Sequence, residues 1–80
     1  MSDTCFYISF CDTDKPKGTQ WLGGAYVKAD TPEEAVTNAW IKECNPGGEA
    51  LIVGPFPLEN VKPDFFHCLL DRQGIEDAKS

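Results

Sequence analysis

The sequence is poor in basic residues. Its 80 residues include 7 Lys and Arg against 13 Asp and Glu, which gives a net charge of −6. Proteins that bind nucleic acid normally carry a basic patch, so we expect no direct contact with nucleic acid. An acidic balance instead aids solubility and is compatible with docking on a basic protein surface.

Histidine is almost absent, which weighs against an enzyme. Nucleophilic catalysis needs a thiol or hydroxyl beside a base, and His67 is the only histidine. It adjoins Cys68, but neighbouring residues on a helix point about 100° apart and do not naturally pair. We therefore predict no catalytic residue and no enzymatic activity.

The four cysteines lack the spacing of a metal site. No Cys-x-x-Cys pair occurs, so neither a metal nor a cofactor is expected. The first residues carry no basic segment of the kind that opens a secretory leader, which predicts a cytoplasmic protein with reduced thiols. No apolar run approaches about 18 residues, so we expect no contact with a membrane.

Hydrophobic periodicity predicts elements in the order β-β-α-β-α. The expected strands are 5–11, 21–29 and 49–56, and the expected helices are 31–44 and 63–72. Thr31, Pro32 and Glu34 form the capping signature that begins the first helix. Residues 1–74 are expected to form one α+β domain with a three-stranded antiparallel sheet of order 2-1-3. Both helices should lie on one face of that sheet, and residues 75–80 should form a disordered polar tail.

Several side chains receive a predicted position from the alternation within these elements. Trp21 should share a strand face with Ala25, and Trp40 should lie on the apolar stripe of the first helix. Gly23-Gly24 indicates a bulge or a close backbone approach. The third strand is apolar on both faces, which is typical of a central strand.

The turn that follows the first helix is the most informative segment. Gly47 and Gly48 permit positive φ, and their N–H groups can form an anion-binding nest. The alternative is a helix stop followed by a turn. A phosphate loop normally precedes a helix and here it follows one, which weakens the phosphate interpretation. Trp21, beside Lys15 and Lys17, can stack on a base or anchor a protein interface, or it can cap the core. The candidate binding residues are Asn45, Gly47, Gly48, Glu49, Trp21, Lys15 and Lys17.

The chain also resembles a group of short uncharacterised proteins of bacteria and their phages. The resemblance is carried by the Trp21-Leu22-Gly23-Gly24 motif and by the Cys44-Asn45-Pro46-Gly47-Gly48-Glu49 motif, within residues 5–56. It implies a similar α+β fold and a bacterial or phage source. It assigns no activity and no site residue.

Two non-enzymatic functions are the leading hypotheses. One is an interaction protein that docks on a protein partner and, in a phage, inhibits a host defence factor. The other is a binder of a small anionic, nucleotide-like ligand at a subunit interface. A short chain commits nearly all its large apolar side chains to the core, so a shallow or shared site is expected. We also expect a homodimer or a higher oligomer, because small sheets often associate through an open face or edge.

Overall fold

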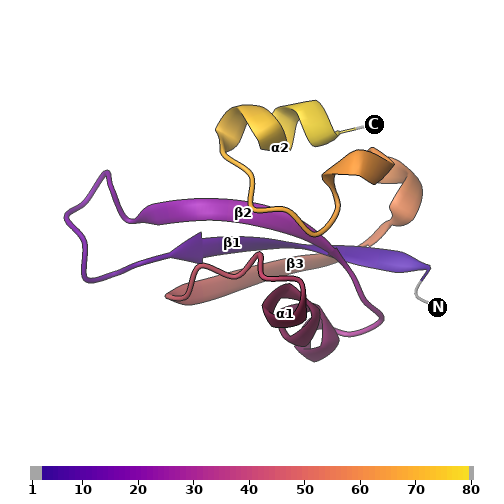
Figure 1. The fold of residues 1–80 in the computed structure, drawn as a ribbon, viewed down its shortest axis with the longest axis horizontal. Helices are drawn as coiled ribbons and strands as arrows, with labels where there is room; N and C mark the ends of the chain where they lie inside the picture. Colours follow the sequence, from indigo (N-terminus) through magenta and orange to yellow (C-terminus); the bar gives the residue numbers. More distant parts are fainter. Residues whose placement is uncertain (1–2, 80) are drawn as a thin grey trace.

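A three-stranded antiparallel sheet lies at the centre of the protein (Figure 1). The computed structural model describes residues 3–79. The strand order is β2-β1-β3, which confirms the predicted α+β class and sheet order. The strands are β1 (Thr4–Cys11), β2 (Trp21–Lys28) and β3 (Glu49–Pro57), and the helices are α1 (Pro32–Ile41) and α2 (Arg72–Ala78). Two short 3-10 helices, Leu58–Asn60 and Pro63–Phe65, lie between β3 and α2.

One face of the sheet packs against α1. The side chains of Phe6, Ile8 and Phe10 alternate along β1 and are buried there. From α1, Ala35 and Ala39 face this core, and their small side chains let the helix approach the sheet closely. The sequence therefore places the largest buried side chains on the central strand and the smallest ones on the helix that covers it.

The opposite face is covered by α2 and the 3-10 segments, so the expectation of both helices on one face was wrong (Figure 1). The second face of β1 and β2 is itself apolar, since Cys5 and Tyr26 are buried on it. Leaving it open would expose that surface to water, and the C-terminal segment packs over it instead. Ala78 of α2 and Val61 complete this second cluster as fully or nearly fully buried residues.

The C-terminal helix begins later than the sequence pattern predicts. Asp71 caps α2, because its carboxylate accepts a hydrogen bond from the Gly74 N–H at 2.7 Å. Gly74 is thus in the first turn of the helix rather than at its stop. Since α2 runs to the buried Ala78, the predicted disordered tail at residues 75–80 was wrong for its described part. Residue 80 lies outside the described residues.

The first helix follows its capping signature. The Thr31 hydroxyl accepts a hydrogen bond from the Glu34 N–H at 3.1 Å, and Pro32 is the first helical residue. The buried stripe is narrower than predicted, because Trp40 is 59% exposed. Trp40 follows Ala39 directly, so it lies about 100° around the helix from the side that meets the sheet.

A bulge at the start of β2 moves Trp21 to the α2 face. Phe10 pairs with Gly23 and Cys11 pairs with Trp21, so the register shifts between the two pairs. The bulge adds one residue to β2 between Trp21 and Gly23, which reverses the alternation of side chains between the two faces. Trp21 therefore does not share a face with Ala25, contrary to the prediction. The close approach expected at Gly23-Gly24 is confirmed. A Cβ at Gly24 would lie 2.6 Å from the Tyr7 hydroxyl.

Candidate functional site

The predicted site residues converge on one end of the sheet. Cys11, the last residue of β1, pairs with Trp21 on one side and with Glu49 on the other. The turn at 45–49 and the loop at 12–20 therefore both end beside Cys11. The two predicted segments thus meet at one end of the sheet, and their binding role stays a prediction.

The local structure of the 45–49 turn explains the presence of Asn45, Gly47 and Gly48. The Asn45 side-chain oxygen accepts a hydrogen bond from the Gly47 N–H at 2.8 Å, which closes an Asx turn. Gly47 and Gly48 have φ values of 92° and 74°. A Cβ on Gly48 would overlap the carbonyl oxygen of Cys11, whereas Gly47 has open space around it. The turn thus fixes how the chain enters β3.

Trp21 is held on both sides by its neighbours. Its indole N–H donates to the Ser9 hydroxyl at 2.9 Å, and the Arg72 guanidinium lies 5.5 Å from its ring centroid. Lys15 and Lys17 are exposed in the 12–20 loop, to which the Gln20 amide is hydrogen-bonded. The structure brings Trp21 next to an arginine that the sequence analysis did not consider.

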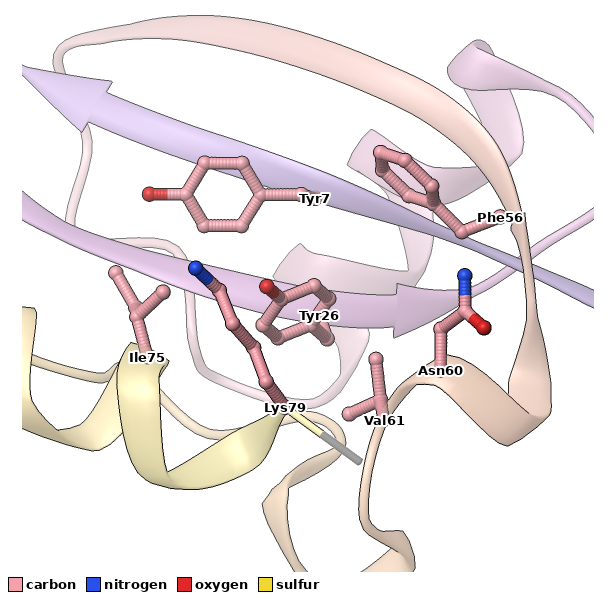
Figure 2. Close-up of a pocket in the computed structure, with 7 residues that line it drawn as sticks. All are labelled: Tyr7, Tyr26, Phe56, Asn60, Val61, Ile75 and Lys79. Carbon is pink, nitrogen blue, oxygen red and sulfur yellow. The ribbon is translucent and has the colours of Figure 1, made fainter.

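A concave groove opens on the α2 face, away from the predicted turn (Figure 2). Its volume is about 500 Å³, and its lining is mostly apolar. The sheet supplies the floor, while α2 and the segment after β3 supply the walls (Figure 2). The lining residues are Tyr7, Tyr26, Phe56, Asn60, Val61, Ile75 and Lys79.

Polar groups converge at the centre of this apolar groove. The rings of Tyr7 and Tyr26 are 5.2 Å apart and tilted by 47°, and the Lys79 side chain points toward both of them (Figure 2). Burial raises the pKa of Tyr26, so its hydroxyl is protonated at neutral pH and is able to donate. The Lys79 ammonium is 3.1 Å from a Glu76 carboxylate oxygen, and this exposed pair raises the pKa of Lys79.

A second cavity continues the groove along the same face. It has a volume of about 440 Å³ and shares Tyr7 and Ile75 with the first cavity. Trp21, Arg72 and Glu76 also line it. The two cavities together form an aromatic channel with a cation, Lys79 or Arg72, along each part. This combination suits a ligand that has a planar ring and an anionic group.

Sequence reasoning missed this groove because four separate segments build it. The one available signal was the alternation of β1 and β2, in which Tyr7 and Tyr26 lie on the strand face opposite to that of Ile8 and Ala25. The walls come from residues 60–61 and from α2, where the sequence predicted a tail. Without the position of α2, Ile75 and Lys79 could not be assigned to the site.

No cysteine, histidine or carboxylate side chain of residues 3–79 lines the groove of Figure 2. Burial raises the pKa of the Cys5 and Cys44 thiols, which keeps both protonated at neutral pH. The imidazole of His67 accepts a hydrogen bond from the Lys28 N–H at 3.3 Å and is thus bonded to the outer edge of β2. Within residues 3–79, no three His, Cys, Asp or Glu side chains lie close enough together to hold a metal ion. Nor is any helix of these residues both long and apolar enough to cross a membrane.

Comparison of the chain with protein families, with curated proteins and with solved structures finds no significant match. The resemblance to short bacterial and phage proteins therefore stays a prediction. The role as an inhibitor of a host defence factor rests on that resemblance and stays a prediction as well.

Proposed function

We propose that the protein is a non-enzymatic binding protein whose groove takes a small ligand with a planar ring and an anionic group. The observation that supports it is the channel in which Tyr7 and Tyr26 line an apolar surface beside Lys79. Aromatic rings bind a planar group through their faces, and the ammonium binds an anionic group. A nucleotide combines both properties and is the simplest probe.

The distribution of charge supports this function over an acidic docking surface. Carboxylates occur on both sides of the sheet, with Glu33 and Glu34 on α1 and Glu76 and Asp77 on α2. An acidic protein that docks on a basic partner would instead gather its carboxylates on one face. Lys79 is the one charged residue that lines the groove, and its ammonium, which is paired with Glu76, supports binding of an anionic group despite the net charge of −6.

The proposal is tested by titrating isotope-labelled protein with adenosine monophosphate, adenosine and inorganic phosphate. We expect the monophosphate to shift the backbone resonances of Tyr7, Tyr26 and Ile75, because it alone carries both groups. Adenosine and phosphate should bind more weakly. Absence of groove shifts with all three probes at millimolar concentration would contradict the proposal.

Two lysine variants locate the anion. Lys79→Gln should weaken binding of the monophosphate by about ten- to a hundredfold, because it removes a charge-assisted hydrogen bond. Lys17→Gln makes the same charge change in the exposed 12–20 loop and should leave the affinity unchanged. The reverse result would move the ligand to the end of the sheet where the sequence pattern predicted it.

A further inference from the structure

The outer edge of β3 is the only sheet edge that stays unpaired within residues 3–79. The other outer edge, on β2, is bonded to the segment after the second 3-10 helix. Gly24 and Leu70 exchange two backbone hydrogen bonds of 3.0 and 2.7 Å, and the His67 N–H donates to Tyr26 at 2.9 Å. β3 pairs with β1 alone. Its free N–H and C=O groups are therefore a template for another strand.

Only the second half of this edge is protected against pairing. Pro55 and Pro57 lack N–H groups, and the register of β3 against β1 shifts opposite Phe6. The first half, Ala50-Leu51-Ile52-Val53, contains no proline and no charge. Proteins normally blunt an exposed edge with proline, a charge or a bulge, and this half has none of them. Pairing is thus open over residues 50–53.

Apolar side chains flank the same half on both faces of the sheet. Leu51 is 67% exposed and Val53 is 44% exposed on the α2 face, opposite Ser9 and Tyr7. On the α1 face, Ile52 shares a shallow cavity with Val36. A surface of this kind marks an interface with another protein, because isolated monomers rarely leave such side chains together in water.

Trp40 extends this surface along α1. It follows Val36 by one helical turn, so it lies on the flank of α1 that faces β3. Trp40 is 59% exposed, so its indole offers a large apolar surface to a partner. A second protein beside β3 would cover Trp40 as well as the strand edge. Trp40 and the edge of β3 thus form one surface that a single partner can cover.

We propose that residues 50–53 of β3 pair antiparallel with the same residues of a second copy, which joins two sheets into one of six strands. The segment is apolar and self-complementary, as a twofold interface requires. Glu49 is the only charged residue of β3. Antiparallel pairing centred anywhere within 50–53 places Glu49 opposite residues 51–57 of the second copy, so no two like charges meet.

The symmetry of this pairing determines where the other surfaces lie. Antiparallel strands in one sheet are related by a twofold axis perpendicular to the sheet, so equivalent faces lie on the same side. The α1 helices with their Trp40 side chains then flank the seam on one side. The two α2 grooves open on the other side, next to Leu51 and Val53. The interface thereby covers Trp40 on one side and Leu51 and Val53 on the other.

The test is the mass of the intact protein, measured by light scattering during size-exclusion chromatography over a range of concentrations. We expect twice the chain mass of 8.8 kDa for the wild type. Leu51→Lys should elute as a monomer, with the dissociation constant raised by about a hundredfold, since it places two lysines in the apolar seam. Leu51 is exposed, so the variant should keep the wild-type far-ultraviolet circular dichroism.

Ile41→Lys is the matched control. Ile41 is also 67% exposed, and either substitution changes the net charge from −6 to −5. Ile41 follows Asn38 by three residues, and the Asn38 amide donates to the Lys28 carbonyl of β2, so both lie on the flank away from β3. We expect this variant to remain a dimer. Dissociation of both variants alike would overturn the assignment of the seam to β3.

Hydrogen exchange supplies a second measurement at the strand itself. The amides of residues 50–53 should exchange more slowly as the concentration of the wild type rises, and Leu51→Lys should abolish that dependence. A wild type that is monomeric at high micromolar concentration would overturn the proposal and leave the edge to a strand of a different protein. A dimer in which these amides exchange at a constant rate would overturn it too.

Discussion

The two glycines of the 45–49 turn should differ strongly when each is replaced by alanine. Both have positive φ, which costs an L-residue about 1–2 kcal/mol. Alanine recovers about 0.4–1 kcal/mol by restricting the unfolded chain. Since nothing lies near the Cβ position of Gly47, Gly47→Ala should cost about 1 kcal/mol in the free energy of unfolding.

Gly48→Ala adds a steric conflict to the same backbone strain. Its Cβ would overlap the carbonyl oxygen of Cys11, which is backbone at the junction of all three strands. Overpacking costs about 1–3 kcal/mol, so the total should reach about 2–4 kcal/mol. A domain of 80 residues has about 4–12 kcal/mol in all. The variant should therefore fold only marginally.

Thermal unfolding followed by circular dichroism measures this difference. For a domain of this size, 1 kcal/mol corresponds to about 4–8 °C in Tm. We expect Gly47→Ala to unfold within about 8 °C of the wild type and Gly48→Ala to lose more than about 10 °C. Equal losses for both variants would refute the reasoning, because the steric conflict would then contribute nothing. A ligand role for the turn should be tested with Gly47→Ala alone.

The remaining predictions concern a core residue, the cap of α1 and the titration of His67. Ile8→Ala should lower the free energy of unfolding by about 2–5 kcal/mol in urea titrations, since Ile8 is fully buried. Thr31→Ala should cost about 1 kcal/mol in the same assay by removing the cap of α1. Burial, with the nearby Lys42 and Lys28, lowers the pKa of His67 below its usual 6.5. As the pH falls through 6.5, the unfolded chain therefore binds more protons at His67 than the folded protein does, and the free energy of unfolding should decrease. Urea titrations at several pH values measure this decrease, and His67→Gln should remove it.

Local signals were sufficient for the order of the elements and the start of α1 in the first two thirds of the chain, although not for the positions of Trp21 and Trp40. The Thr31 hydroxyl and Pro32 define the start of α1, and the alternation of Phe6, Ile8 and Phe10 defines the buried face of β1. Strand order followed from connection rules, because the hairpin and the crossover leave few arrangements. These features depend on residues close in sequence, so a single sequence contains them.

The C-terminal third could not be predicted because its structure depends on distant partners. The aromatic and leucine residues of 65–70 match a helical stripe, yet their backbone pairs with the outer edge of β2. The groove depends on the same docking, since Ile75 and Lys79 reach it only once α2 covers the sheet. The exposure of Trp40 has a similar origin, because a helix that buries two alanines leaves its larger neighbours outside.

The groove and the β3 edge lie side by side, and one comparison separates them. Val53 of the edge pairs with Tyr7, which lines the groove. None of the seven lining residues of the groove lies within residues 50–53, so we expect Leu51→Lys to bind adenosine monophosphate with the affinity of the wild type while it dissociates to monomers. Titrations of both proteins at one concentration measure this. A loss of affinity in Leu51→Lys would show that the second copy completes the ligand site, because binding and association are then linked and dilution of the wild type must weaken binding as well.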